Sequence, residues 1–181
     1  MSIARLVIGG SIALLAFLNV AADAPRATAP AMVTFEDKKD NVRFQYPDTW
    51  KTKPDKDDVL MLVPAQGNSD RDITFDVPGL PPHFPGMIRL SLIENGYIKD
   101  QKKQHPGIKV VQAADDPRAG GGKARLVELT WQQNGKAYTD LGLLIMRKDV
   151  VYIFSADASA DELASLRADF DKIVATLTWT K

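Results

Sequence analysis

Three long strand-like segments joined by two very short turns, near the end of the sequence, place the strongest restriction on the fold. Residues 123–133 alternate apolar and polar side chains, residues 136–147 return, and residues 150–154 follow. Asn134-Gly135 is a strong hairpin signal, because both residues tolerate positive φ, and Lys148-Asp149 makes the second turn. Residues 143–146 and 150–154 are apolar on both sides, as in strands covered on two faces. The sequence therefore predicts a three-strand meander.

The hydrophobic period changes from two to about 3.6 after this meander. The apolar positions that mark one helical face are Leu163, Leu166, Phe170, Ile173, Val174 and Leu177. Ser159 and Glu162 have the spacing of a capping box at the start of the helix. A long amphipathic helix is therefore expected to pack on the sheet.

The earlier part of the chain adds more short strands and one helix. Expected strands cover residues 33–36, 42–46, 59–63, 73–77, 87–93 and 108–113, and a charged turn region is expected at 51–58. Asn95 is expected to cap a helix that runs to about Gln104, before Pro106-Gly107. Together these elements predict a single α+β domain, in which helices pack on a mostly antiparallel sheet.

The first two dozen residues have the pattern of an export signal. Arg5 precedes an uninterrupted apolar run from Leu6 to Leu18, and the small residues Ala21 and Ala22 follow. The run is shorter than the roughly 20 residues that span a bilayer comfortably. We therefore expect a signal peptide at 1–22 that is cleaved after Ala22, a flexible leader at 23–32 and a globular domain at 33–181.

Composition narrows the classes of function. The sequence has 23 basic and 23 acidic residues and no cysteine. No basic stripe suggests nucleic-acid binding, and without a cysteine there is no acceptor for a lipid anchor. We expect a secreted or periplasmic protein without disulfides, released after signal cleavage and without a membrane span. An uncleaved N-terminal anchor is the alternative.

Residues typical of catalysis or metal binding are few. The two histidines, His83 and His105, lie in proline-containing loops, and a hydrolase or metal-dependent enzyme that uses them is the alternative function. The run from Gly120 to Lys123 lacks phosphate-loop spacing and leads into a strand. The acidic loop at 68–72 lacks the glycine and the closing glutamate of a calcium loop, and the acidic cluster at 55–58 is diluted by Lys53 and Lys56. No catalytic residue, cofactor or metal ligand is therefore predicted.

The best candidate for a working surface is the proline-rich segment at 78–86. Its side chains Leu80, His83 and Phe84 combine apolar and polar character in a loop, as contact surfaces often do. The alternative is that Leu80 and Phe84 fold back onto the core. We therefore assign a possible partner-binding loop to Leu80, His83 and Phe84.

The order of motifs resembles the PsbP/DcrB/Mog-like group of domains. The segment Phe44-x-Tyr-Pro-x-x-Trp50 is similar to their opening strand. Gly121-Gly-Lys-Ala-Arg125 then leads into a meander, Tyr152-Ile-Phe-Ser-Ala156 follows, and a helix with Phe170 ends before Thr176-Leu-Thr-Trp179. The resemblance implies an α/β/α sandwich with a central antiparallel sheet, used by non-catalytic accessory proteins with divergent functions.

From the residues and this resemblance together we expect a secreted or periplasmic, non-enzymatic accessory domain. Its partner would be a protein or a small molecule of unknown identity, and no cofactor is implied.

Overall fold

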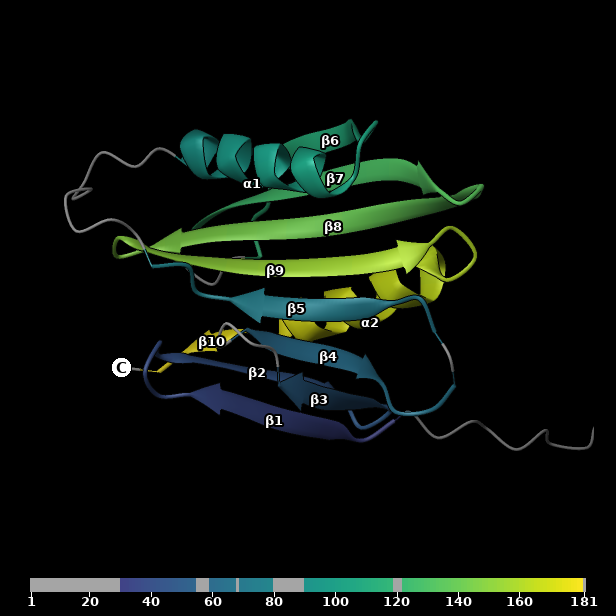
Figure 1. The fold of residues 1–181 in the computed structure, drawn as a ribbon. Helices are drawn as coiled ribbons and strands as arrows, with labels where there is room; N and C mark the ends of the chain where they lie inside the picture. Colours follow the sequence, from purple (N-terminus) through teal and green to yellow (C-terminus); the bar gives the residue numbers. More distant parts are fainter. Residues whose placement is uncertain (1–29, 55–58, 68, 80–89, 119–121, 181) are drawn as a thin grey trace, which may run out of the picture.

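The computed structural model describes residues 30–54, 59–67, 69–79, 90–118 and 122–180 (Figure 1). The predicted signal peptide and most of the leader lie outside these residues. No helix in these five ranges is long and apolar enough to cross a bilayer.

A large antiparallel sheet forms the centre of the fold. Its strand order is β3 (Trp50–Pro54), β4 (Leu60–Pro64), β5 (Asp72–Asp76), β9 (Val150–Ser159), β8 (Lys136–Arg147), β7 (Lys123–Gln133) and β6 (Lys109–Asp115). The meander β7–β8–β9 is confirmed, with Asn134 at φ 54° and Gly135 at φ 76° in the first turn. Lys148 and Asp149, at φ 48° and 64°, make the second turn.

A small antiparallel sheet joins the two ends of the domain. β2 (Val42–Pro47) lies between β1 (Met32–Asp37) and β10 (Thr178–Trp179). Phe35 is directly opposite Phe44, and Trp179 is opposite Val42. The first and last strands of the described chain therefore share one partner.

The two helices lie on opposite faces of the large sheet (Figure 1). α1 (Leu90–Gln104) packs on the face that carries Leu144, and α2 (Leu163–Ala175) packs on the face that carries Leu143. Because neighbouring residues of a strand point to opposite faces, β7, β8 and β9 are covered on both sides.

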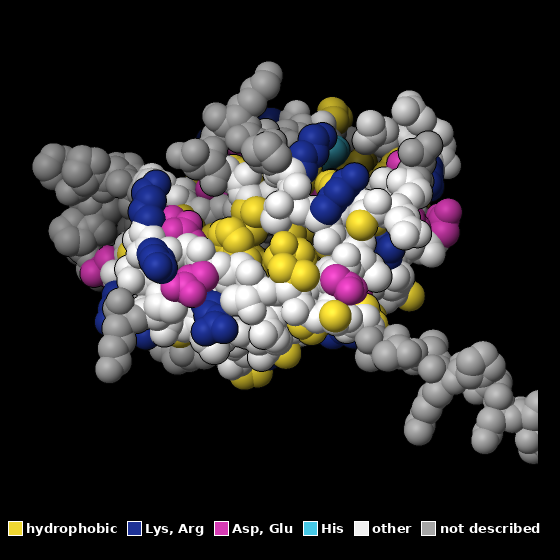
Figure 2. All heavy atoms as spheres, turned by 90° about the horizontal axis from the view of Figure 1, so that it is seen from below, with side chains coloured by type: hydrophobic (Ala, Val, Ile, Leu, Met, Phe, Trp, Pro, Cys, Tyr) yellow, Lys and Arg dark blue, Asp and Glu magenta, His cyan; other side chains and the backbone are white. Residues whose placement is uncertain are grey.

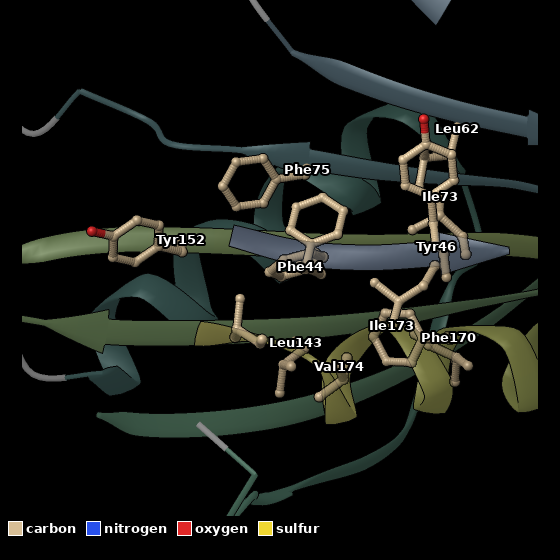
Figure 3. Packing of buried hydrophobic residues seen from close by; sticks show 14 of the residues in the cluster. Phe44, Tyr46, Leu62, Ile73, Phe75, Leu143, Tyr152, Phe170, Ile173 and Val174 are labelled. Carbon is tan, nitrogen blue, oxygen red and sulfur yellow. The ribbon is translucent and has the colours of Figure 1, made fainter. Parts of the chain in front are cut away.

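The main core lies between the large sheet, the small sheet and α2. Figure 3 shows side chains from β2, β5, β8, β9 and α2 meeting there. Phe44, Phe154 and Leu143 are fully buried, and the Phe44 ring centroid is 5.2 Å from that of Phe154. The predicted helix face is confirmed by four of its residues, Leu166, Phe170, Ile173 and Val174, which are buried. Phe44, Tyr46 and Trp50, which carry the resemblance in the opening strand, are core residues.

Two predicted elements differ from the structure. Residues 90–93 belong to α1 and not to a strand, because Leu90, Ile93 and Tyr97 follow a helical spacing and pack on the sheet together. Residues 51–54, the first part of the expected turn region, belong to β3 instead, since this strand pairs with β4 and buries Trp50.

The predicted capping box is wrong. Glu162 occupies the N-cap of α2 and makes no side-chain cap hydrogen bond. Its carboxylate instead accepts hydrogen bonds from the Ser69 hydroxyl at 2.7 Å and from the Asp70 backbone N–H at 3.1 Å. Glu162 thus holds the loop before β5 against α2, a long-range contact that local spacing could not indicate.

The predicted fold class is correct at the level of α+β: the part of the chain that the structure describes forms one domain with antiparallel sheets and two helices. The α/β/α sandwich that the resemblance implied is confirmed only in part. The layer opposite α1 combines α2 with the small three-stranded sheet.

Candidate functional site

A hollow of about 450 Å³ lies between β1 of the small sheet and β4 and β5 of the large sheet. Its lining combines four apolar and four charged side chains: Phe35, Leu60, Phe75 and Val77, with Asp37, Lys39, Asp40 and Asp76. We call it the inter-sheet hollow. Figure 2 shows the side of the molecule on which β1 lies in Figure 1: hydrophobic side chains gather near its centre, with acidic and basic ones around them.

The floor of the inter-sheet hollow is the outer margin of the aromatic core. The Phe35 ring centroid is 4.9 Å from that of Phe44 and 6.2 Å from that of Phe75, and Phe75 in turn lies 4.8 Å from Phe154. Phe35, Leu60 and Val77 are only partly buried against this core. Their remaining exposed surface faces solvent because no further strand continues the small sheet beyond β1 among the described residues.

The turn between β1 and β2 positions two acidic groups at the rim. One Asp37 carboxylate oxygen, Oδ1, accepts the backbone N–H of Lys39 at 2.8 Å and that of Asp40 at 3.1 Å. Asn41 closes the turn at φ 56°, and the Tyr152 hydroxyl donates to the Asp40 carbonyl at 3.0 Å. Partial burial, followed by the nearby Asp37 charge, raises the pKa of Asp40. The turn therefore holds two carboxylates close together.

A second polar cluster ties α1 to the large sheet. The Tyr97 hydroxyl donates to Asp140 Oδ2 at 2.5 Å and lies 2.8 Å from Ser155 Oγ, which donates to Asp140 Oδ1 at 2.7 Å. Asp140 is completely buried. Both of its oxygens are thus used to hold the helix, and this cluster is an anchor for α1.

Asp140 also ends a row of carboxylates across three neighbouring strands. Asp72 is directly opposite Asp157, and Asp157 is directly opposite Asp140; such positions bring Cβ atoms to about 4.5–5.5 Å. Burial raises the pKa of Asp72 and of Asp140 to about 6, and it raises that of Asp157 well above its usual value. Asp157 Oδ1 is buried and has no hydrogen-bond partner within the described residues.

Neither cluster is arranged for metal binding. Across the described ranges, no group of three or more histidine, cysteine, aspartate or glutamate side chains is placed to hold a metal ion. Directly opposite aspartates on adjacent strands share a face of the sheet, but they do not converge on one point.

His105 lies in an aromatic stack at the end of α1. Its ring centroid is 4.1 Å from that of Trp131, which lies 5.6 Å from Tyr138. Two small hollows, of about 340 and 270 Å³, share Pro106, Trp131 and Gln132 in their walls. Burial lowers the pKa of His105, and no described hydroxyl or carboxylate side chain hydrogen-bonds to its ring.

The partner-binding loop expected from the sequence, Leu80, His83 and Phe84, lies outside the described residues. So do the acidic run at 55–58 and, in the run from Gly120 to Lys123, Gly120 and Gly121. The inter-sheet hollow was not predicted, because its walls come from three separate parts of the chain. One signal was present: Phe35 and Asp37 are two residues apart and so share a face of one strand.

No protein-family model matches the sequence, and no curated protein sequence matches it either. Solved structures do match. Cyanobacterial PsbP (CyanoP) from Synechocystis is 13% identical with a TM-score of 0.66, over 88% of this chain and 98% of CyanoP. PA94 from Pseudomonas aeruginosa, titled a putative regulator of unknown function, is 18% identical with a TM-score of 0.54, over 83% of this chain and 98% of PA94.

A third structure is LpqN of Mycobacterium tuberculosis, titled as involved in cell envelope biogenesis. It is 20% identical with a TM-score of 0.55, over 77% of this chain and 83% of LpqN. These likenesses establish the fold, and they confirm the resemblance seen in the sequence: the chain has a PsbP/DcrB-like fold.

Proposed function

We propose that the chain is a secreted or periplasmic accessory domain that binds another molecule and does not transform it. The observation that carries the proposal is the inter-sheet hollow, in which the partly exposed side chains Phe35, Leu60 and Val77 lie beside charged groups, on a lining whose accessible surface is mostly polar. Binding sites typically combine an apolar floor with a few placed polar groups. Asp140 serves a different purpose, since it is hydrogen-bonded to Tyr97 and Ser155 and holds α1 on the sheet.

The export-signal pattern of Arg5, Leu6 to Leu18 and Ala22 supports the extracytoplasmic location. The involvement of LpqN in cell envelope biogenesis agrees with it. The location is tested by expressing the full chain in a bacterial host and measuring the intact mass of the exported protein. A mass without residues 1–22 supports the proposal, and a full-length mass supports the uncleaved anchor instead.

The binding role is tested by capture from the extracytoplasmic fraction of the source organism. The wild type is compared with Leu60→Asp, which places a charge in the floor, and with Leu80→Ala/Phe84→Ala, which alters the predicted loop. Circular dichroism first establishes that each variant is folded. A captured molecule lost only with Leu60→Asp assigns binding to the hollow, and one lost only with the loop variant assigns it to residues 80–84.

Two results would contradict the proposal. Turnover of a substrate by the purified protein, abolished in a His105→Ala variant that keeps its fold, would make the protein an enzyme. Capture that is identical for the wild type and for both variants would remove both surfaces from the proposal.

A further inference from the structure

We propose that the inter-sheet hollow binds a small amphiphilic cation, with the apolar part on Phe35 and Leu60 and the positive charge beside Asp37 and Asp40. This inference rests on the binding function proposed above and names the chemical class of the ligand.

The size of the hollow favours a small molecule. Its volume of about 450 Å³ falls in the range of small-molecule sites. A stable protein interface needs roughly 800 Å² on each partner, far more than eight lining residues provide. The ligand that fits is therefore a single apolar group with one charged head.

The floor can take the apolar part without rearranging the core. Phe75 is buried at 5% exposure and packs against Phe44 and Phe154. Phe35, Leu60 and Val77 lie around it and keep exposed surface. Covering that surface removes apolar area from water at about 25 cal/mol per Å².

The charged side chains at the rim determine the sign of the charge that the ligand should carry. The turn between β1 and β2 places two carboxylates at the hollow, those of Asp37 and Asp40, beside one ammonium, that of Lys39. Asp37 is fixed by its hydrogen bonds to the backbone of the turn, so it cannot move away from Asp40. A cation placed between the two relieves their repulsion, whereas an anion adds to it.

The raised pKa of Asp40 also favours a cationic ligand. It is raised by burial first and by the charge of Asp37 second, and Lys39 only partly offsets these effects. A bound ammonium group would stabilise the ionised form and lower this pKa. Ligand binding should therefore be accompanied by proton release at mildly acidic pH.

The test uses three probes with one tail and three heads: octylamine, octanoate and octan-1-ol. Each is titrated into ¹⁵N-labelled protein lacking residues 1–22 at neutral pH, and affinity is taken from the amide shifts. We expect octylamine to bind about tenfold more tightly than octanoate and to shift amides at 35–40, 60 and 75–77. High salt should weaken octylamine binding and leave octanol binding unchanged.

Matched variants distinguish the effect of the charges at the rim from the effect of the protein's total charge. Asp37→Asn and Asp40→Asn each remove one rim charge, and an asparagine at 37 still offers an oxygen to the turn. Asp100→Asn removes one charge on the exposed side of α1, where Asp100 pairs with Lys103 at 2.6 Å. The preference for octylamine should fall in both rim variants and persist in Asp100→Asn.

Each other outcome has a defined meaning. If the three probes shift the same amides and bind with equal affinity, the ligand is not specifically a cation. The binding function proposed above would still hold. Shifts that are spread over the surface would overturn the hollow as a site. A concentration-dependent dimer abolished by Leu60→Asp would assign the hollow to a second copy of the chain and overturn the inference.

Discussion

At the scale of single residues, Gly142 decides whether α1 can dock on the sheet. A Cβ atom at this position would lie 2.5 Å from Tyr97 Cε1, so the tyrosine ring occupies the space that a side chain would need. The ring must pass over Gly142 for its hydroxyl to reach Asp140 and Ser155. The absence of a side chain in β8 is therefore a requirement of the anchor.

We expect Gly142→Ala to destabilise the protein by about 1–3 kcal/mol, because overpacking displaces Tyr97 from its hydrogen bonds. The free energy of unfolding in urea measures this loss. Gly96→Ala is the matched control: Gly96 lies in the interior of α1 with open space around it, and alanine there should stabilise the helix by about 0.5–1 kcal/mol. Equal effects of the two substitutions would contradict the role assigned to Gly142.

The carboxylate row predicts an unusual dependence of stability on pH. The pKa values of Asp72 and Asp140 are raised to about 6 in the folded protein, and that of Asp157 is raised well above its usual value. Between about pH 4 and pH 6 the folded state therefore binds more protons than the unfolded state. The stabilisation is complete below about pH 4 and is lost as pH rises through 6, by about 1.4 kcal/mol for each pKa unit.

Asp157→Asn isolates this effect. An amide keeps the size of the side chain but has no charge to bury, so the variant should be more stable than the wild type at pH 8. The difference should vanish near pH 4, where the wild-type carboxyl is protonated. Urea unfolding of both proteins at several pH values measures this, and a difference that does not depend on pH would contradict the prediction.

At the scale of elements, the two edges of the large sheet are built differently. β3 presents the exposed side chains of Lys51 and Lys53, a residue type that prevents a sheet edge from pairing with another chain. β6, at the other edge, exposes Val110 and Val111 at 45% and 59%, and a register shift lies between Val110 and Gln112. This shift is a bulge, which is the main protection of the second edge.

We expect Val111→Lys to reduce self-association of the protein at high concentration, with stability changed by less than about 0.5 kcal/mol because the side chain is exposed. Light scattering over a concentration series measures the change. Thr52→Lys is the control, since it adds the same charge to an edge that already carries lysines. An equal reduction in both variants would mean that total charge, and not β6, controls association.

Element boundaries show what the sequence could predict and what it could not. The ends of β7 and β8 were predicted correctly because Asn134-Gly135 and Lys148-Asp149 fix the turns locally. The start of α1 was misplaced because Ile88, Leu90 and Leu92 alternate like a strand. Packing of Leu90 against the sheet decides in favour of the helix, and that contact is not visible in local spacing.

At the scale of the whole molecule, the candidate site exists only when the two sheets are brought together. Phe35 comes from β1, Leu60 from β4 and Phe75 from β5. Each was recognisable as an apolar strand residue, and the resemblance to PsbP-like domains indicated a sandwich. The gap between the sheets depends on where the small sheet ends, and no motif in the sequence specifies that.

The small sheet also makes the end of the chain essential to the fold. β10 pairs with β2, the Thr180 N–H donates to the Asn41 carbonyl at 3.0 Å, and the Trp179 ring lies 4.7 Å from Tyr152. Leu177 is buried in the main core. We therefore expect a chain that ends at Ala175 to lose at least about 3 kcal/mol of stability, as large truncations of buried side chains do.

A chain lacking residues 1–22 should keep its full stability, because among the described residues every buried core residue lies after residue 41. Urea unfolding of the two truncated chains and of a Trp179→Ala variant tests this asymmetry. If the chain ending at Ala175 does not fold at all, Trp179→Ala still gives a measurable loss, since it removes the ring that packs on Tyr152. Unchanged stability in Trp179→Ala would show that β10 is dispensable and that β1 and β2 hold the small sheet without it.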